Sequence, residues 1–173
     1  RKDGIKATDC FPMMISGDIK GLFIFGEDPV RTDPNTHHVI KALESLDFFV
    51  VDDLFMTETA KLADVVLPGI SYTEKEGTFS NTERRVQRIR KAVESPGQAR
   101  PDTWIFTEIM NRMGYAQPHL TPAEIMDEIA SVTPSFTGIS HARLDSKEVA
   151  GKGIQWPCPS KDHPGTPIMH VGK

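Results

Sequence analysis

The segments GLFIFGEDP, residues 21–29, and FFVVDD, residues 48–53, decide the fold. Each is a short apolar run that ends in Gly, Asp or Pro, which is typical of a strand buried on both faces that opens into a loop at its carboxyl end. Between them, Asp33-Pro34 predicts the start of a helix. The apolar positions of that helix fall on one face: Val39, Leu43 and Leu46. The two segments therefore predict a strand, a helix and a second, parallel strand.

Residues downstream of the second strand extend this pattern and then depart from it. The run DVVLP, residues 64–68, predicts a third strand, preceded by a short helix after Thr57 that ends near Leu62. Three strands alternating with helical connections are typical of a right-handed parallel α/β layer. Residues 77–93 alternate strand-forming and basic side chains, and we interpret them as a short hairpin beside this sheet.

Two further helices are predicted in the second half of the chain. One begins at Asp102 and stops at Gly114, and the other begins at Thr121, with Glu124 at capping-box spacing. The residues expected to face inward are Ile105, Ile109 and Met113 in the first helix and Ile125 and Ile129 in the second.

We divide the chain into an opening segment (1–20), an α/β part (21–132) and an irregular segment (133–173) rich in Pro, Gly, Ser and His. The irregular segment needs neighbours to pack against. Because residue 1 is Arg rather than Met, we expect the chain to be an internal piece of a longer polypeptide.

Composition excludes several classes of function. The chain has 20 basic and 24 acidic residues and a net charge of −4, so nothing favours binding to nucleic acid or to an anionic membrane. We interpret its basic run, residues 84–91, as an ion-paired or solvated strand face. Cys10 and Cys158 show no metal-binding spacing and fit a reducing compartment, so we expect a cytoplasmic protein, and one disulfide between them is the open alternative.

Acidic loops at the ends of the first two strands are the first candidates for a site, because ligands of open parallel sheets bind outside the carboxyl ends of the strands. The loops are Gly26-Glu27-Asp28 and Asp52-Asp53. A carboxylate accepts two hydrogen bonds from a guanine or a ribose diol, so a nucleotide-like ligand would explain both loops. The alternative is an acidic turn in solvent. Neither GxGxxG nor GxxxxGK[ST] is present, and no residue pattern predicts a catalytic group or a metal site.

Four longer motifs occur in a fixed order, namely FGEDP (25–29), VVDDLFMTETA (50–60), ADVVLP (63–68) and EKEGTFSNTERRVQ (74–87). This order resembles the molybdopterin oxidoreductases. A fifth, QWPCP (155–159) with HPGT (163–166), is similar to the catalytic (alpha) subunit of formate dehydrogenases. The resemblance implies a Rossmann-like sheet layer with flanking helices, and oxidation of formate to carbon dioxide by the whole subunit.

The resemblance also implies a cofactor, namely molybdenum or tungsten held by two molybdopterin guanine dinucleotides. It places Gly26, Glu27 and Asp28 in a cofactor loop, Asp52 and Asp53 at the guanosine part of one dinucleotide, and Lys75 and Asp102 at further contacts to the same cofactor. From the residues alone, Lys75 is as well explained by solvation and Asp102 by helix capping. Asp52 stands where formate dehydrogenases often carry Gln, so Asp53 is the stronger candidate.

Features that the family needs for catalysis have no counterpart in these residues. The resemblance assigns the 4Fe-4S cysteines, the metal-ligating Cys or selenocysteine, and the His and Arg that handle formate to other parts of the parent subunit. We therefore expect an isolated chain without activity, whose partners are the rest of the catalytic subunit and electron-transfer subunits. Two alternatives stay open: a non-catalytic nucleotide- or pterin-binding module, and a fragment of another family member such as a nitrate reductase.

Overall fold

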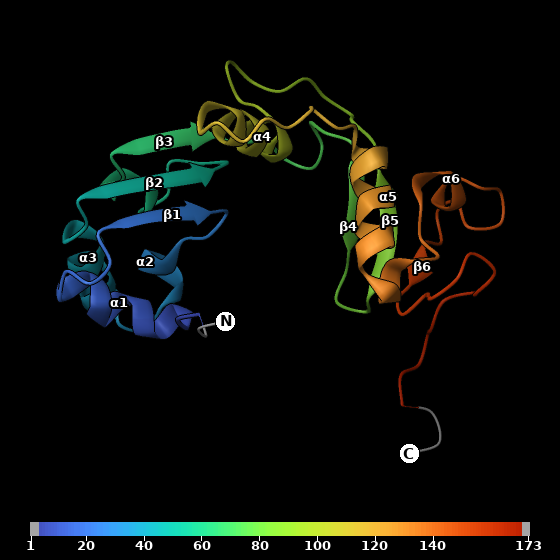
Figure 1. Cartoon of the computed structure of the whole chain (residues 1–173), viewed down its shortest axis with the longest axis horizontal. Coiled ribbons are helices and arrows are strands. Elements are labelled where there is room, and N and C mark those ends of the chain that lie inside the picture. Colours follow the sequence, from blue (N-terminus) through green and yellow to red (C-terminus); the bar gives the residue numbers. More distant parts are fainter. Residues whose placement is uncertain (1–3, 171–173) are drawn as a thin grey trace. The chain divides into compact units, whose positions relative to one another are not determined.

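The computed structural model describes residues 4–170, and these form two compact units (Figure 1). The first unit contains the described residues up to Ile70 together with Ser95–Phe106. The second contains Ser71–Glu94 and the described residues from Thr107 onward. The first three residues of the predicted opening segment and the last three of the irregular segment lie outside the described residues.

A three-stranded parallel sheet organises the first unit. The strands are β1 (Gly21–Phe25), β2 (Phe48–Asp53) and β3 (Val65–Pro68), in the order β1-β2-β3. The other elements of this unit are α1 (Ala7–Ile15), α2 (Pro29–Thr32), α3 (Thr36–Glu44), the 3-10 turn η1 (Ala60–Leu62) and the N-terminal turn of α4 (Asp102–Arg112). The mixed α/β fold with a parallel layer and flanking helices is thus confirmed.

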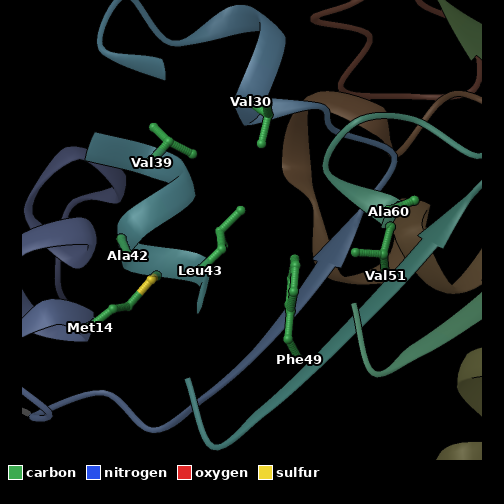
Figure 2. Close-up of a cluster of buried hydrophobic side chains, with 8 residues drawn as sticks. All are labelled: Met14, Val30, Val39, Ala42, Leu43, Phe49, Val51 and Ala60. Atoms are coloured by element: carbon green, nitrogen blue, oxygen red, sulfur yellow. The ribbon is translucent and has the colours of Figure 1, made fainter. Parts of the chain in front are cut away.

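The core of the first unit lies on one face of this sheet (Figure 2). Phe49 and Val51 of β2 meet Leu43 of α3 there, and all three side chains are almost fully buried. The other members of this buried cluster are Met14, Val30, Val39, Ala42 and Ala60. Apolar side chains spaced along α1 and α3 therefore cover the sheet from one side, as amphipathic helices do.

The opposite face of β1 is only partly covered within the first unit. Phe23 is 37% exposed and Phe25 is 49% exposed, whereas Leu22 and Ile24 between them pack against the core. The prediction of strands buried on both faces is therefore wrong for β1, whose burial alternates along the strand. Phe106 of α4 contacts this exposed face, with its ring centre 5.6 Å from that of Phe23 and 5.2 Å from that of Phe25.

Helix α3 begins later than Asp33-Pro34 predicts. Asn35 caps it, because the Asn35 side chain accepts a hydrogen bond from His38 N at 3.3 Å. The Asp33 carboxylate instead accepts from Asn35 N at 2.9 Å, which closes a turn just before the helix. The apolar face was predicted correctly at Val39 and Leu43, which are buried.

A second, antiparallel sheet organises the second unit. It consists of β4 (Gly77–Ser80), β5 (Arg85–Ile89) and β6 (Ile154–Gln155), in the order β4-β5-β6. The hairpin predicted over residues 77–93 is confirmed as far as Ile89, but it pairs with β6 and not with a strand of the parallel sheet. The other elements are the rest of α4, α5 (Pro122–Val132), η2 (Pro134–Phe136) and α6 (His141–Leu144).

Two of the predicted helix ends are confirmed in the second unit. Gly114, with a φ of 87°, follows the end of α4, and Thr121 and Glu124 form the complete capping box of α5. Two inward-facing predictions are wrong: Met113 is 81% exposed and Ile129 is 39% exposed, while Met126 supplies the buried side chain of α5.

Within residues 4–170, no helix combines the length and the apolar character that crossing a membrane requires. Cys10 and Cys158 are both free thiols.

Candidate functional site

The carboxyl ends of the three parallel strands meet at one edge of the first unit. Phe25 of β1 pairs with Asp52 of β2, and Asp53 pairs with Pro68 of β3. The loops that follow are tied back to β2, since Gly26 N donates to Asp52 O at 2.9 Å and Gly69 N donates to Asp53 O at 3.1 Å. The two acidic loops predicted from the sequence therefore do lie at the same edge.

Two carboxylates converge on Gly69 at this edge. A Cβ atom built on Gly69 would lie 3.0 Å from Oδ1 of Asp52 and 3.0 Å from Oδ1 of Asp102. Asp52 is 1% exposed, whereas Asp102 is half-buried. Because Gly69 has no side chain, both carboxylates can lie close to the backbone of this loop. Sequence reasoning placed Asp52 and Asp102 among the site residues but missed Gly69, for which the one signal was its position directly after a strand.

Asp102 occupies the first turn of α4. The carbonyl of Pro101 accepts from Trp104 N at 2.9 Å and from Ile105 N at 3.1 Å, so Asp102 is the first helical residue and not the cap. A carboxylate in the first turn is favoured by the partial positive charge of the helix N-terminus. Asp102 therefore lies beside Gly69 as a residue of the first turn of α4 and not as its cap.

Asp53 is a loop-forming residue at the same edge. Its Oδ1 accepts from Leu54 N at 2.7 Å and its Oδ2 accepts from Thr57 Oγ1 at 3.3 Å. Thr57 Oγ1 in turn accepts from Ala60 N at 3.1 Å, as its predicted role in starting a short helix requires. Asp53 therefore shapes the loop after β2 and is half-buried, with part of its carboxylate already in use.

The loop after β1 contains Gly26, Glu27 and Asp28. Gly26 has a φ of 63°, a conformation that glycine adopts without strain. Glu27 is exposed. The Asp28 carboxylate accepts two hydrogen bonds from Thr59, from its backbone N at 3.1 Å and from its Oγ1 at 2.6 Å. Sequence reasoning did not single out Thr59, which lies 31 residues from Asp28 along the chain.

Lys75 belongs to the second unit, in the turn before β4, and its contact with the cofactor stays a prediction. The basic run 84–91 includes side chains that bind parts of the second unit. Arg84 donates to the carbonyls of Trp156 and Thr166, and Arg88 pairs with Asp145 at 3.3 Å. The interpretation of this run as an ion-paired strand face is therefore confirmed for Arg88.

A hollow of about 790 Å³ lies between α5 and α6 in the second unit. Burial lowers the pKa of His141 on its wall, and the charge of Arg88 lowers it further. Arg143, also on the wall, donates to the carbonyls of Gly138 and His163 at 2.6 and 2.5 Å, so its guanidinium serves the packing of this unit. Among residues 4–170, no group of three or more His, Cys, Asp or Glu side chains could hold a metal ion.

Comparison with known proteins identifies the family. Residues 1–112 match the family model described as molybdopterin oxidoreductase. The chain belongs to the molybdopterin oxidoreductase family. The strands of the parallel sheet, both acidic loops, Lys75 and Asp102 all lie within the matched residues.

Curated relatives include subunits of formate dehydrogenases. The chain is 52% identical over 157 residues to F420-dependent formate dehydrogenase 2 subunit alpha of Methanococcus maripaludis, an alignment that covers 90% of this chain and 22% of the relative. It is 50% identical to F420-dependent formate dehydrogenase subunit alpha of Methanocaldococcus jannaschii, over 90% of this chain and 23% of the relative. A putative formate dehydrogenase of Staphylococcus haemolyticus is 49% identical, over 90% and 15%. The chain thus spans less than a quarter of the length of these relatives.

Among solved structures, acetylene hydratase from Pelobacter acetylenicus has a similar fold. The two share 26% sequence identity with a TM-score of 0.64, over 79% of this chain and 19% of the other.

Proposed function

We propose that this chain is part of the alpha subunit of a formate dehydrogenase and that the carboxyl edge of β1, β2 and β3 contacts the guanosine part of a molybdopterin guanine dinucleotide. Family membership supports the molybdopterin, and the names of the relatives support formate as the substrate of the whole subunit. The observation that carries the guanosine assignment is the convergence of Asp52 and Asp102 on Gly69.

The chemistry of this edge fits a guanine nucleoside. Guanine presents two adjacent N–H donors on its pairing edge, and a carboxylate is the acceptor that binds such a pair through two charge-assisted hydrogen bonds. The missing side chain at Gly69 lets the carboxylates of Asp52 and Asp102 lie together beside the backbone of the loop. When bound, the cofactor supplies the redox chemistry of the metal. The residues of this chain bind and orient its nucleotide end.

Other parts of the proposal concern the parent polypeptide. Its 4Fe-4S cluster, its choice of molybdenum or tungsten and the residues that bind formate belong to segments outside this chain. Because the relatives are alpha subunits, the partners of the parent polypeptide include other subunits, of which electron-transfer subunits are our proposal. A cytoplasmic location stays a prediction.

Nucleotide titration of the 173-residue chain tests the guanosine assignment. We expect GMP to bind in preference to AMP, and Asp52→Asn and Asp102→Asn to weaken GMP binding by about tenfold each, through loss of a charge-assisted hydrogen bond. Asp47→Asn is the matched control, since Asp47 is an exposed carboxylate just before the opposite end of β2. Equal affinity for GMP and AMP, or equal losses in all three variants, would contradict the assignment.

Measurements on the native polypeptide distinguish the proposed function from two alternatives. A fragment of a different family member is supported by the likeness to acetylene hydratase, and assays of the whole native polypeptide with formate and with acetylene distinguish the two. A non-catalytic binding module predicts a native polypeptide near 19.2 kDa. The formate dehydrogenase proposal predicts a mass several-fold larger, detectable through the peptide 75–84 after size separation of an extract.

A further inference from the structure

Thr59 connects two loops at the carboxyl edge through hydrogen bonds of its hydroxyl and its backbone N–H. Its Oγ1 donates to Asp28 Oδ1 at 2.6 Å and accepts from Val30 N at 3.1 Å, and its backbone N also donates to Asp28 Oδ1 at 3.1 Å. Thr59 is fully buried and Val30 is 7% exposed. A hydroxyl that both donates and accepts in a buried position has few other arrangements available to it.

Asp28 holds the capping position of α2 but does not cap it. Its side chain makes no hydrogen bond to the first turn of α2 and is turned to Thr59 instead. The hydroxyl of Thr59 takes over the capping task, because it accepts from Val30 N in that first turn. The loop after β1 therefore depends on a residue from the loop after β2 for its hydrogen bonding.

These hydrogen bonds flank the loop residues next to the proposed guanosine site. On one side of Glu27, Gly26 N is bound to Asp52 O, and on the other side Asp28 is bound to Thr59. The loop after β2 is fixed at its start by the Asp53 carboxylate. Both loops are thus held in one arrangement by contacts within the first unit, as pre-organised binding sites require.

We propose that Thr59 is a positioning residue of the guanosine site, and that Asp28 acts through Thr59 and makes no contact with the nucleotide. The inference rests on the proposed function. It changes the expected role of Asp28 from a cofactor contact to a part of the framework that sets the positions of Gly26 and Glu27. Loss of the Thr59 hydroxyl frees both loops. Ordering the loops again on binding costs free energy, and this cost lowers the affinity for the nucleotide.

Three variants of the 173-residue chain separate positioning from direct contact. Thr59→Val keeps the shape of the side chain but removes the hydroxyl, and we expect about tenfold weaker GMP binding. Thr59→Ser keeps the hydroxyl and should bind within about twofold of the original chain. Asp28→Asn keeps an oxygen that can accept from Thr59 and removes the charge, so GMP binding should also stay within about twofold.

A variant at the other end of the sheet is the control for a general loss of stability. Asp64 Oδ2 accepts from Phe49 N at 2.7 Å near the start of β2, so Asp64→Ala removes a structural hydrogen bond far from the carboxyl edge along the strands. We expect Asp64→Ala to lower the unfolding midpoint and leave GMP affinity unchanged. Without nucleotide, hydrogen exchange at the amides of Val30 and Thr59 should be about tenfold faster in Thr59→Val than in the original chain or in Thr59→Ser.

Each outcome supports or overturns the inference. Wild-type GMP affinity in Thr59→Val overturns the positioning role, and so does an equal loss of affinity in Asp64→Ala. A tenfold loss in Asp28→Asn shows that Asp28 contacts the nucleotide directly and also overturns it. If Thr59→Val does not fold, Thr59→Ser and Asp28→Asn decide between the two roles of Asp28. If the wild-type chain shows no preference for GMP over AMP, the proposed function and this inference are both overturned. The variant results above overturn only the positioning role.

Discussion

The loops of the first unit are held by carboxylates, whereas in the second unit guanidinium groups act beside carboxylates such as that of Glu124. In the first unit, carboxylates accept hydrogen bonds from the backbone and from threonine hydroxyls, as Asp28, Asp53 and Asp64 do. In the second unit, guanidinium groups donate to backbone carbonyls, as Arg84 and Arg143 do. Both strategies satisfy backbone groups that have no partner in a sheet ladder or a helix.

The carboxylates at the carboxyl edge of the first unit differ in their surroundings. Asp28 and Asp53 accept hydrogen bonds that shape their loops. Asp52 and Asp102 each have an oxygen 3.0 Å from a Cβ atom built on Gly69. Tryptophan fluorescence can follow the unfolding of each unit separately, because Trp104 lies in the first unit and Trp156 in the second. Variants that keep one tryptophan therefore report on one unit each.

The largest effect is expected from Arg143→Met in the second unit. Methionine keeps the apolar stem but leaves the carbonyls of Gly138 and His163 without the donor that they now share. We expect the second unit to lose about 3 kcal/mol of unfolding free energy, measured by denaturant unfolding with Trp156 fluorescence. An unchanged Trp156 transition would show that the guanidinium contacts do not hold this unit together.

Gly69→Ala is expected to have the next largest effect, and it acts on the first unit. The new Cβ atom would lie 3.0 Å from an oxygen of both Asp52 and Asp102, so both carboxylates have to shift slightly to make room. We expect a loss of about 1–3 kcal/mol in the transition reported by Trp104. GMP affinity should fall by more than tenfold. Normal GMP binding in this variant would remove Gly69 from the site.

Thr121→Ala tests capping in the second unit. Thr121 Oγ1 accepts from Glu124 N, and the Glu124 carboxylate accepts from Thr121 N at 2.7 Å, which also lowers the pKa of Glu124. Loss of the cap should destabilise the second unit by about 1 kcal/mol in Trp156-monitored unfolding. GMP affinity should be unaffected, and a change in it would contradict the assignment of the nucleotide site to the first unit.

The smallest effect concerns pH. Burial lowers the pKa of His141, and nearby Arg88 adds to this, while Asp145 opposes it. The unfolded chain, with a histidine pKa near 6.5, therefore takes up this proton at higher pH than the folded chain does. The second unit should lose less than about 1 kcal/mol between about pH 7.5 and about pH 5.5. His141→Gln should abolish this loss, and a slope that survives in the variant must come from other groups.

Local patterns in the sequence predicted much of the fold. The three parallel strands follow from short apolar runs that end in Gly, Asp or Pro, and the helix α5 follows from the spacing of Thr121 and Glu124. The start of α3 was predicted at the wrong residue because Asp33 and Asn35 are both good caps, and only their turn geometry decides between them. The exposed face of β1 was also missed, since an unbroken apolar run does not reveal whether both faces are covered.

The candidate site was predictable in outline but not in its division of roles. Parallel strands bring their carboxyl ends together, so the edge containing Asp52 could be predicted from the order of the strands. The contact between Asp28 and Thr59 spans 31 residues, and no local pattern indicates it. The approach of Asp102 to Gly69 likewise depends on where α4 lies against the sheet, which spacing along the chain does not determine.

Binding of guanosine at the carboxyl edge of the first unit can be measured by titrating the ¹⁵N-labelled chain with GMP, with AMP as the control, and following the backbone amide signals of glycines. We expect the signals of Gly26 and Gly69 to shift and saturate with GMP and not with AMP. Gly138 and Gly153 of the second unit should not respond. Absence of any shift at Gly26 and Gly69, or shifts confined to Gly138 and Gly153, would contradict guanosine binding at this edge.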